Sequence, residues 1–217
     1  MDPPDLELDH VFYLTSELDR HTAALVDAGF AIEPGQRHPG QGTANRRVLF
    51  HRNYLELLFV DDLAASRQNP LRLHRRLAPE AARIGVVARG RFPRGFDDAF
   101  EPYEPPYAPG LTIWVHSRSL RDPRLPMFLV LDESTFGPRE AMWPRTRFRA
   151  QPQWFAHGNG ATDLVEVTAP MGADLAQLPL SAVRATAGRG STLVVAAPTQ
   201  FAVSLDEAVS ITTSRSP

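Results

Sequence analysis

The first sixty residues constrain the fold most, because they place one helix among four closely spaced strands. An apolar-rich pattern predicts a strand over 8–14, and Thr15-Ser16-Glu17 supplies the start signal of a helix that Gly29 ends. Three more strands are expected over 30–33, 47–51 and 54–60, the last two joined by a tight hairpin. Such a β-α-β-β-β unit, residues 8–61, cannot cover its own apolar face. We therefore expect it to curve against a second sheet from the rest of the chain.

The remaining chain supplies strands for such a partner. A strand-rich but irregular middle, residues 82–131, contains predicted strands at 84–88, 111–116 and 126–131. Four further strands are expected over 163–169, 182–187, 191–196 and 201–205, with a helical turn near 173–178. We interpret residues 157–214 as an abbreviated second β-α-β-β-β unit within a single domain of 217 residues.

Two segments lack periodic structure. Prolines throughout residues 91–110 rule out a regular helix there. Residues 133–156 show no period and contain Pro138, Pro144 and Pro152. A segment of that length within a compact domain is typical of a lid or a binding loop. An arm that docks a partner is the alternative.

Composition excludes several classes of protein. Hydrophobic residues make up 43% and charged residues 22%, which argues against disorder, and the net charge of −2 gives no support for nucleic-acid binding. The longest apolar runs are far shorter than the about 20 residues of a membrane span, and the acidic N-terminus is unlike a signal peptide. The absence of cysteine excludes disulfides, thiolate metal sites and cysteine nucleophiles. A cytoplasmic location is the default expectation.

Several short motifs are distinctive: Leu8-Asp9-His10-Val11, Ala28-Gly29-Phe30, the loop 38–45, Tyr54-Leu55-Glu56-Leu57-Leu58, Leu125-Pro126-Met127-Phe128 and His157-Gly158-Asn159-Gly160-Ala161. With these motifs the chain resembles the glyoxalase-like domain proteins of the vicinal oxygen chelate superfamily, which includes glyoxalases, bleomycin-resistance proteins and extradiol dioxygenases. The resemblance is specific over residues 8–61 and patchy over residues 82–170. After residue 170 it rests mostly on the order of the predicted strands. It implies an α+β fold in which tandem βαβββ units form a curved mixed sheet, a half-barrel cup around a small-molecule site. One reaction is not implied, because the scaffold carries several chemistries.

The resemblance implies a metal site at His10 and Glu56, since the first-strand His and fourth-strand Glu of the family bind a divalent ion. Zn, Mn, Fe or Ni suits these donors and polarises a carbonyl or enediolate oxygen. The residues themselves support a metal ligand at Glu56 in part. Its carboxylate lies in an apolar strand, where burial without a partner is costly. Its partner is a metal, an Arg or His10. Strand alternation predicts that both side chains face the interior within about 5 Å of each other. His116 or Glu166 should supply a third ligand.

Further candidates lie in loops. His38, Thr43 and Asn45 belong to a glycine-rich loop that can border a ligand, or that forms a turn satisfying its own hydrogen bonds. His157 is a candidate base with Asn159 beside it, or a packed histidine. In the segment 133–156, aromatic and Arg side chains can clamp an aromatic or anionic substrate, with a solvated loop as the alternative. We take Trp143 and Arg145 as the candidates there.

The predicted function is that of a metal-assisted lyase, isomerase or dioxygenase acting on a small oxygenated molecule, with Glu56 and His157 as catalytic groups. A metal-free binding or sequestration protein of the bleomycin-resistance type is the alternative. It is motivated by the incomplete set of second-unit ligands and by the aromatic, Arg-rich segment 133–156. Gly85 falls at the position of His10 if residues 84–88 correspond to the first strand, whereas Glu166 does so if residues 164–168 correspond to it. Neither nucleic acid nor membrane is expected as a partner, and a homodimer is compatible with either function.

Overall fold

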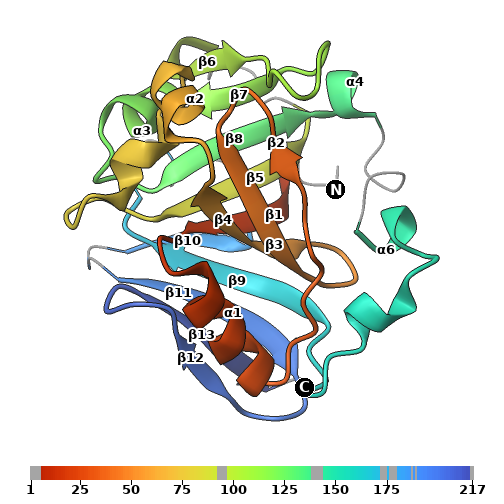
Figure 1. Ribbon diagram of the computed structural model, residues 1–217. Helices are drawn as coiled ribbons and strands as arrows, with labels where there is room; N and C mark the ends of the chain where they lie inside the picture. Colours follow the sequence, from red (N-terminus) through yellow and green to blue (C-terminus); the bar gives the residue numbers. More distant parts are fainter. Residues whose placement is uncertain are drawn as a thin grey trace.

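The computed structural model describes residues 6–91, 97–137, 144–171, 175, 180–186, 188 and 190–215. Within these ranges the strands form two sheets, one above the other in Figure 1. The upper, eight-stranded sheet contains β1 (Leu6–Leu14), β2 (Arg37–His38), β3 (Thr43–Leu49), β4 (Tyr54–Val60), β5 (Ile84–Gly90), β6 (Phe100–Tyr103), β7 (Ile113–His116) and β8 (Met127–Asp132). The lower, five-stranded sheet contains β9 (Asp163–Ala169), β10 (Val183–Ala185), β11 (Ser191–Ala197), β12 (Ala202–Ser204) and β13 (Val209–Arg215).

The described helices are short, apart from the three-turn helix α1. They are α1 (Leu18–Asp27), α2 (Leu63–Gln68), η1 (Leu73–Leu77), η2 (Asp97–Ala99), α3 (Ser117–Arg121), α4 (Glu133–Phe136), α6 (Pro144–Arg147) and η3 (Pro152–Phe155). Helix α1 spans the predicted residues, although its N-cap residue Glu17 makes no side-chain capping bond, and Gly29 follows the helix with a φ of +88° that favours glycine. Among the described helices, none is long and apolar enough to cross a membrane.

The upper sheet is built from two units that meet where β1 pairs with β5. Its strand order is β2-β3-β4-β1-β5-β8-β7-β6. Strand β1 runs parallel to β4 and antiparallel to β5, and β5 runs parallel to β8. The pattern of pairing therefore reads the same from both edges, as in a duplicated unit. This arrangement confirms the predicted α+β fold of tandem βαβββ units that form a half-barrel cup.

The partner of the first unit is not the stretch that the sequence suggested. The middle of the chain, from β5 to β8, completes the cup, whereas residues 157–214 form the separate lower sheet. Strand periodicity identifies a strand but not the strand to which it hydrogen-bonds, so the sequence pattern does not identify the irregular middle as the second unit. The helical turn expected near 173–178 lies almost wholly outside the described residues.

The lower sheet repeats the centre of the upper one. Its order, β10-β9-β11-β13-β12, has the same alternation of parallel and antiparallel pairs as β4-β1-β5-β8-β7. The last stretch of chain thus contains two shortened units rather than one. A smaller difference concerns residues 30–33, which form one isolated bridge, Glu33 to Arg47, in place of the predicted strand. Pro34 and Gly35 interrupt the pairing at that point.

Two apolar clusters divide the interior. The larger lies between the sheets and contains outward-facing residues of the cup, such as Val11, Tyr13 and Val86, with Leu193 and Ile211 of the lower sheet. The smaller lines the concave face of the upper sheet; its members include Phe12, Leu58, Val87, Val115, Met127 and Leu129. The lower sheet therefore covers the back of the cup and leaves the concave face available for a ligand.

Arg76 of η1 is a buried cation without any carboxylate partner in the described contacts. Its side chain is 2% exposed, and its guanidinium donates to the backbone carbonyls of Ala82, Pro123, Leu125 and Ser119. Burial lowers the pKa of Arg76 to about 10. One side chain thus ties η1 to α3 and to the segment that leads into β8.

We predict that Arg76→Met lowers the free energy of unfolding by about 2–4 kcal/mol, because several buried carbonyls lose their donor. Urea unfolding followed by circular dichroism measures the change. The control is Arg75→Met at the exposed neighbouring residue, expected within about 0.5 kcal/mol of wild type. Equal stabilities of the two variants would contradict the structural role of Arg76.

Candidate functional site

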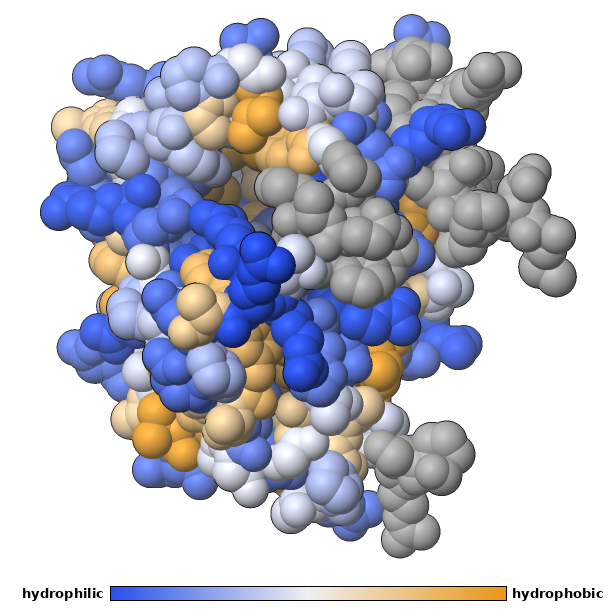
Figure 2. Space-filling model, turned by 90° about the vertical axis from the view of Figure 1, so that its right-hand side faces the viewer, coloured by the Kyte–Doolittle hydropathy of each residue, from blue (hydrophilic) through white to orange (hydrophobic). Residues whose placement is uncertain are grey.

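The concave face of the upper sheet encloses a cavity of about 460 Å³, a size typical of small-molecule sites. Figure 2 shows apolar side chains in a hollow in the upper half of the molecule, bordered by hydrophilic ones. The apolar wall comes largely from the second unit; it includes Val87, Ile113, Met127, Leu129 and Leu131. The polar wall comes largely from the first unit; it includes Asp9, His10, Gln36, His38, Asn45 and Glu56. The cavity therefore has a polar and an apolar side.

A β-bulge in β1 places two consecutive polar residues in this cavity. Leu8 pairs with Ala88 and His10 with Val87, so Asp9 is an extra residue without a counterpart on β5. Regular alternation would direct neighbouring side chains to opposite faces. The bulge re-aims the chain, and both Asp9 and His10 line the cup while Leu8 packs in the core behind it.

Asp9 orients the imidazole of His10. The Oδ1 atom of Asp9 lies 2.6 Å from Nδ1 of His10, and its Oδ2 accepts a bond of 2.6 Å from Nε of Arg89. Burial alone would raise the pKa of Asp9, but the hydrogen bonds and positive charge of these two partners lower it. An ionised Asp9 accepts from Nδ1–H, which leaves the lone pair of Nε2 for a ligand. The imidazole also stacks on Tyr54, with ring centres 4.3 Å apart.

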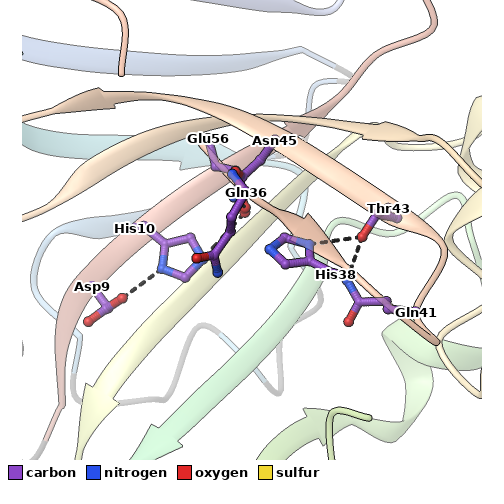
Figure 3. A network of polar contacts seen from close by, with 8 residues as sticks. All are labelled: Asp9, His10, Gln36, His38, Gln41, Thr43, Asn45 and Glu56. Carbon is purple, nitrogen blue, oxygen red and sulfur yellow. Dashed lines mark hydrogen bonds and ion pairs between the residues drawn. The ribbon is translucent and has the colours of Figure 1, made fainter. Parts of the chain in front are cut away.

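Glu56 stands beside His10 as predicted. Glu56 is paired with Phe12 across the parallel β1–β4 ladder, and its Oε2 lies 3.7 Å from Nε2 of His10. The expected approach within about 5 Å is thus confirmed. Asn45 donates from its amide nitrogen to Oε1 of Glu56 and accepts from the backbone N–H of Gln36 at 2.8 Å. Figure 3 shows these side chains converging on one region.

The glycine-rich loop forms the adjoining wall. His38 lines the cavity and stacks on Tyr107, with ring centres 4.6 Å apart. Thr43 is fully buried behind it, 3.0 Å from Nδ1 of His38, and accepts from Gln41 at 2.8 Å (Figure 3). Burial lowers the pKa of His38. His38 and Asn45 therefore border the cavity, whereas Thr43 holds the loop in place.

The cup does not include His116 or Glu166. On β7, Val115 faces the cup, so His116 faces the opposite side, where its ring packs against Phe100. Glu166 lies on β9 of the lower sheet and forms an ion pair of 2.7 Å with Arg184. This placement corrects the expectation that either residue completes a ligand set with His10 and Glu56.

His157 and Asn159 have structural positions. Nδ1 of His157 accepts from the N–H of Ala31 at 3.0 Å, and Nε2 donates to the carbonyl of Leu49 at 2.9 Å. Asn159 donates to the carbonyl of Ala28 at 2.8 Å. These bonds tie the turn before β9 to the end of α1 and to β3. Neither residue lines the cavity, which corrects their predicted catalytic and binding roles.

The segment 133–156 contributes to the cavity through other residues than those predicted. Trp143 lies outside the described residues, and Arg145 is exposed on α6 without lining the cavity. Arg147 and Phe136 line it instead. The guanidinium of Arg147 lies over the ring of Phe148, 5.3 Å from its centre.

Several cavity residues were not found by sequence reasoning. Asp9 and Arg89 are charged residues within apolar strands, which is a signal of a buried pair, but the bulge that joins them has no pattern of its own. Tyr103 and Tyr107 lie in the proline-rich segment 91–110. The prolines predict only that this segment is not a regular helix, and they give no sign that it borders a cavity. The hydroxyl of Tyr103 donates to Gln41 at 3.1 Å and so fixes this segment over the glycine-rich loop.

The donors in the cup fall short of a metal site. His10 and Glu56 are suitably spaced for one ion, yet catalytic metal sites take three protein ligands as a rule. The facing positions of the second unit hold Val87, Arg89 and Leu129. Within the described residues, no group of three or more His, Cys, Asp or Glu could hold an ion. The residues present therefore do not fit the metal that the resemblance implies.

Comparisons with known proteins agree with this fold. The sequence model of the glyoxalase-like domain family matches residues 8–177, so the chain belongs to this family. Among solved structures, a hypothetical protein from Staphylococcus aureus is similar in fold, with a TM-score of 0.56 and 11% sequence identity over 96% of this chain and 98% of that one. No curated protein matches the sequence.

We predict that the protein loses stability below about pH 6.5. Burial lowers the pKa of His157 from its usual 6.5, and the same holds for His21 and His38. As the pH falls through 6.5, the unfolded chain binds protons that the folded chain resists, so the free energy of unfolding decreases, by up to about 1.4 kcal/mol per histidine and pH unit. Above pH 6.5 these histidines are neutral in both states, so they do not make the free energy of unfolding depend on pH.

Urea unfolding at pH 7.5, 6.5 and 5.5 measures this dependence. His157→Gln should be less stable than wild type at pH 7.5, because the bonds to Ala31 and Leu49 are weakened, and its stability should fall less steeply toward pH 5.5. A slope identical to that of wild type would show that His157 does not resist protonation.

Proposed function

We propose that this protein is a metal-independent enzyme of the lyase or isomerase type, which binds a small oxygenated molecule in the cup and transfers a proton through His10. The observation that carries the proposal is the group formed by Asp9, His10 and Glu56 on one side of an otherwise apolar cavity. Buried titratable side chains are costly, and their convergence in a cavity is typical of an active site.

His10 is the expected base. Asp9 holds the Nδ1–H and stabilises the imidazolium that forms when Nε2 accepts a proton. Glu56, 3.7 Å from Nε2, adds a second acceptor on the same side of the ligand. A proton taken from the ligand is then kept between these two groups and can return to another atom of the same molecule. Such an outcome is an isomerisation, or an elimination where a group leaves.

The apolar wall positions the ligand. Leu129, Met127 and Val87 line the cavity beside the polar group, and Tyr107 lines it from the proline-rich segment. Exclusion of water on that side strengthens the interactions on the other, because the local dielectric is low. A ligand with one oxygenated and one hydrocarbon end fits this division.

Exchange of carbon-bound hydrogen in D₂O tests the proposal. A panel of small hydroxyketones, aldehydes and hydroxy acids is incubated with the protein and followed by proton NMR. We expect at least one compound to lose a C–H signal, and His10→Gln to slow this exchange by about 10²–10⁴-fold. His51→Gln, outside the cavity, is the control and should exchange at the wild-type rate.

The same exchange measurement also shows which result would contradict the proposed enzyme. If the wild type exchanges no compound faster than His10→Gln does, the enzymatic proposal is wrong. Binding in the cup without turnover would then favour the second candidate, a small-molecule binding or sequestration protein. The apolar wall and the segment around Tyr107 favour that candidate, since both enclose a ligand whether or not it reacts.

A metal titration tests independence from metal. We predict that Zn²⁺, Mn²⁺, Ni²⁺ or Fe²⁺ raises the melting temperature by less than about 1 °C, because two donors give little preference for the folded state. The chelator-treated protein is compared with His10→Ala and Glu56→Ala. A rise of several degrees that both variants abolish would restore the metal-assisted enzyme as the better proposal.

A further inference from the structure

Arg89 is a buried cation in the wall of the cup. It lies on β5, its side chain is 4% exposed, and it lines the same cavity as His10. Its Nε atom donates to Asp9 at 2.6 Å, and the ring of Phe136 lies over the guanidinium, 5.5 Å from the ring centre. Arg89 thus shares one carboxylate with His10, which places the two side chains next to each other.

One end of this guanidinium has no hydrogen-bond partner in the part of the chain that the structure describes. Nη1 of Arg89 is buried, and no described residue accepts a hydrogen bond from it. A buried donor of a charged group is costly to leave unpaired, because it has lost its hydrogen bonds to water. An unpaired donor on a residue that lines a cavity is therefore a sign of a ligand acceptor.

The other cations of the cavity do not offer the same opportunity. Arg47 is engaged by Glu33 at 2.5 Å and lies over the ring of Phe148. Arg147 is exposed at the rim. Arg89 therefore combines burial, a fixed position and an open donor among the described cations of the cup.

We propose, on the basis of the proposed function, that Arg89 binds the carbonyl or carboxylate oxygen of the substrate through Nη1. When His10 removes a proton from the carbon next to a carbonyl, the C–H bond breaks, the proton passes to Nε2, and the electron pair moves onto that oxygen. A guanidinium at the oxygen stabilises the charge as it develops. The proton then returns to a different atom, so no oxidant or reductant is needed.

This assignment makes Arg89 the specificity residue for an oxygenated ligand. A hydrocarbon of the same shape would leave Nη1 unpaired, and sites built on a buried donor reject such analogues strongly. The apolar wall then accepts the hydrocarbon part of the same molecule.

Three planar probes of similar size test the assignment: benzoate, acetophenone and α-methylstyrene, which replaces the carbonyl of acetophenone by C=CH₂. Titrations followed by protein NMR give the dissociation constants. We expect the wild type to bind benzoate or acetophenone at least about 10-fold more tightly than α-methylstyrene. Preference for benzoate identifies a carboxylate ligand, and preference for acetophenone identifies a neutral carbonyl.

Variants connect the preference to Arg89. Arg89→Met should bring the three affinities within about twofold of one another, and Arg89→Lys, which can still pair with Asp9, should lose most of the preference. Arg121→Met, an exposed residue paired with Glu101, is the control and should keep the wild-type preference. Circular dichroism and urea unfolding establish that each variant is folded. If Arg89→Met does not fold, the comparison of affinities is made with Arg89→Lys instead.

Three outcomes would overturn the assignment: equal binding of all three probes by the wild type, a preference that persists in the Arg89 variants, or no binding of any probe. The D₂O exchange measurement separates this failure from that of the proposed function. If exchange depends on His10 but is unchanged in the Arg89 variants, the enzyme proposal stands and the role of Arg89 is wrong.

Discussion

The carboxylate of Asp9 is the group on which the rest of the site depends. One oxygen contacts Nδ1 of His10 and the other accepts from Arg89, so the carboxylate fixes an imidazole and a guanidinium at the seam between the two units. Burial makes this ion pair costly unless all its bonds are formed. The bulge in β1 provides the geometry, because only an extra residue lets Asp9 and His10 share one face.

The two units of the cup have different roles even though their strands pair in the same pattern. The first unit supplies Glu56 and Asn45 from neighbouring strands, while the corresponding strand of the second unit presents Met127, Leu129 and Leu131. This asymmetry gives the cavity a polar and an apolar wall, and it also explains the shortage of metal donors. The lower sheet repeats the pairing pattern of the upper one, and it packs against the back of the cup.

Sequence reasoning located the first unit and the central pair of the site. Helix α1, the hairpin of β3 and β4, and the approach of His10 to Glu56 follow from local patterns that persist in the structure. The errors concern partners that are distant along the chain. His157, taken as a base, has both ring nitrogens bound to backbone groups of Ala31 and Leu49. No local pattern distinguishes such a histidine from a catalytic one.

The sequence by itself determined most of the strands, although it missed β2, β6 and β13, and it determined that a β-α-β-β-β unit needs a second one. Apolar periodicity and turn residues act over a few positions, and they suffice for these conclusions. The choice of His10 and Glu56 rested on the resemblance to the family, and strand alternation added that both side chains face one cavity. Only the tertiary structure decided that β5 to β8 complete the cup, that residues 157–214 form another sheet, and that Arg89 lies beside Asp9. These features depend on long-range strand pairing and on one bulge, whose free energy arises from contacts between distant residues.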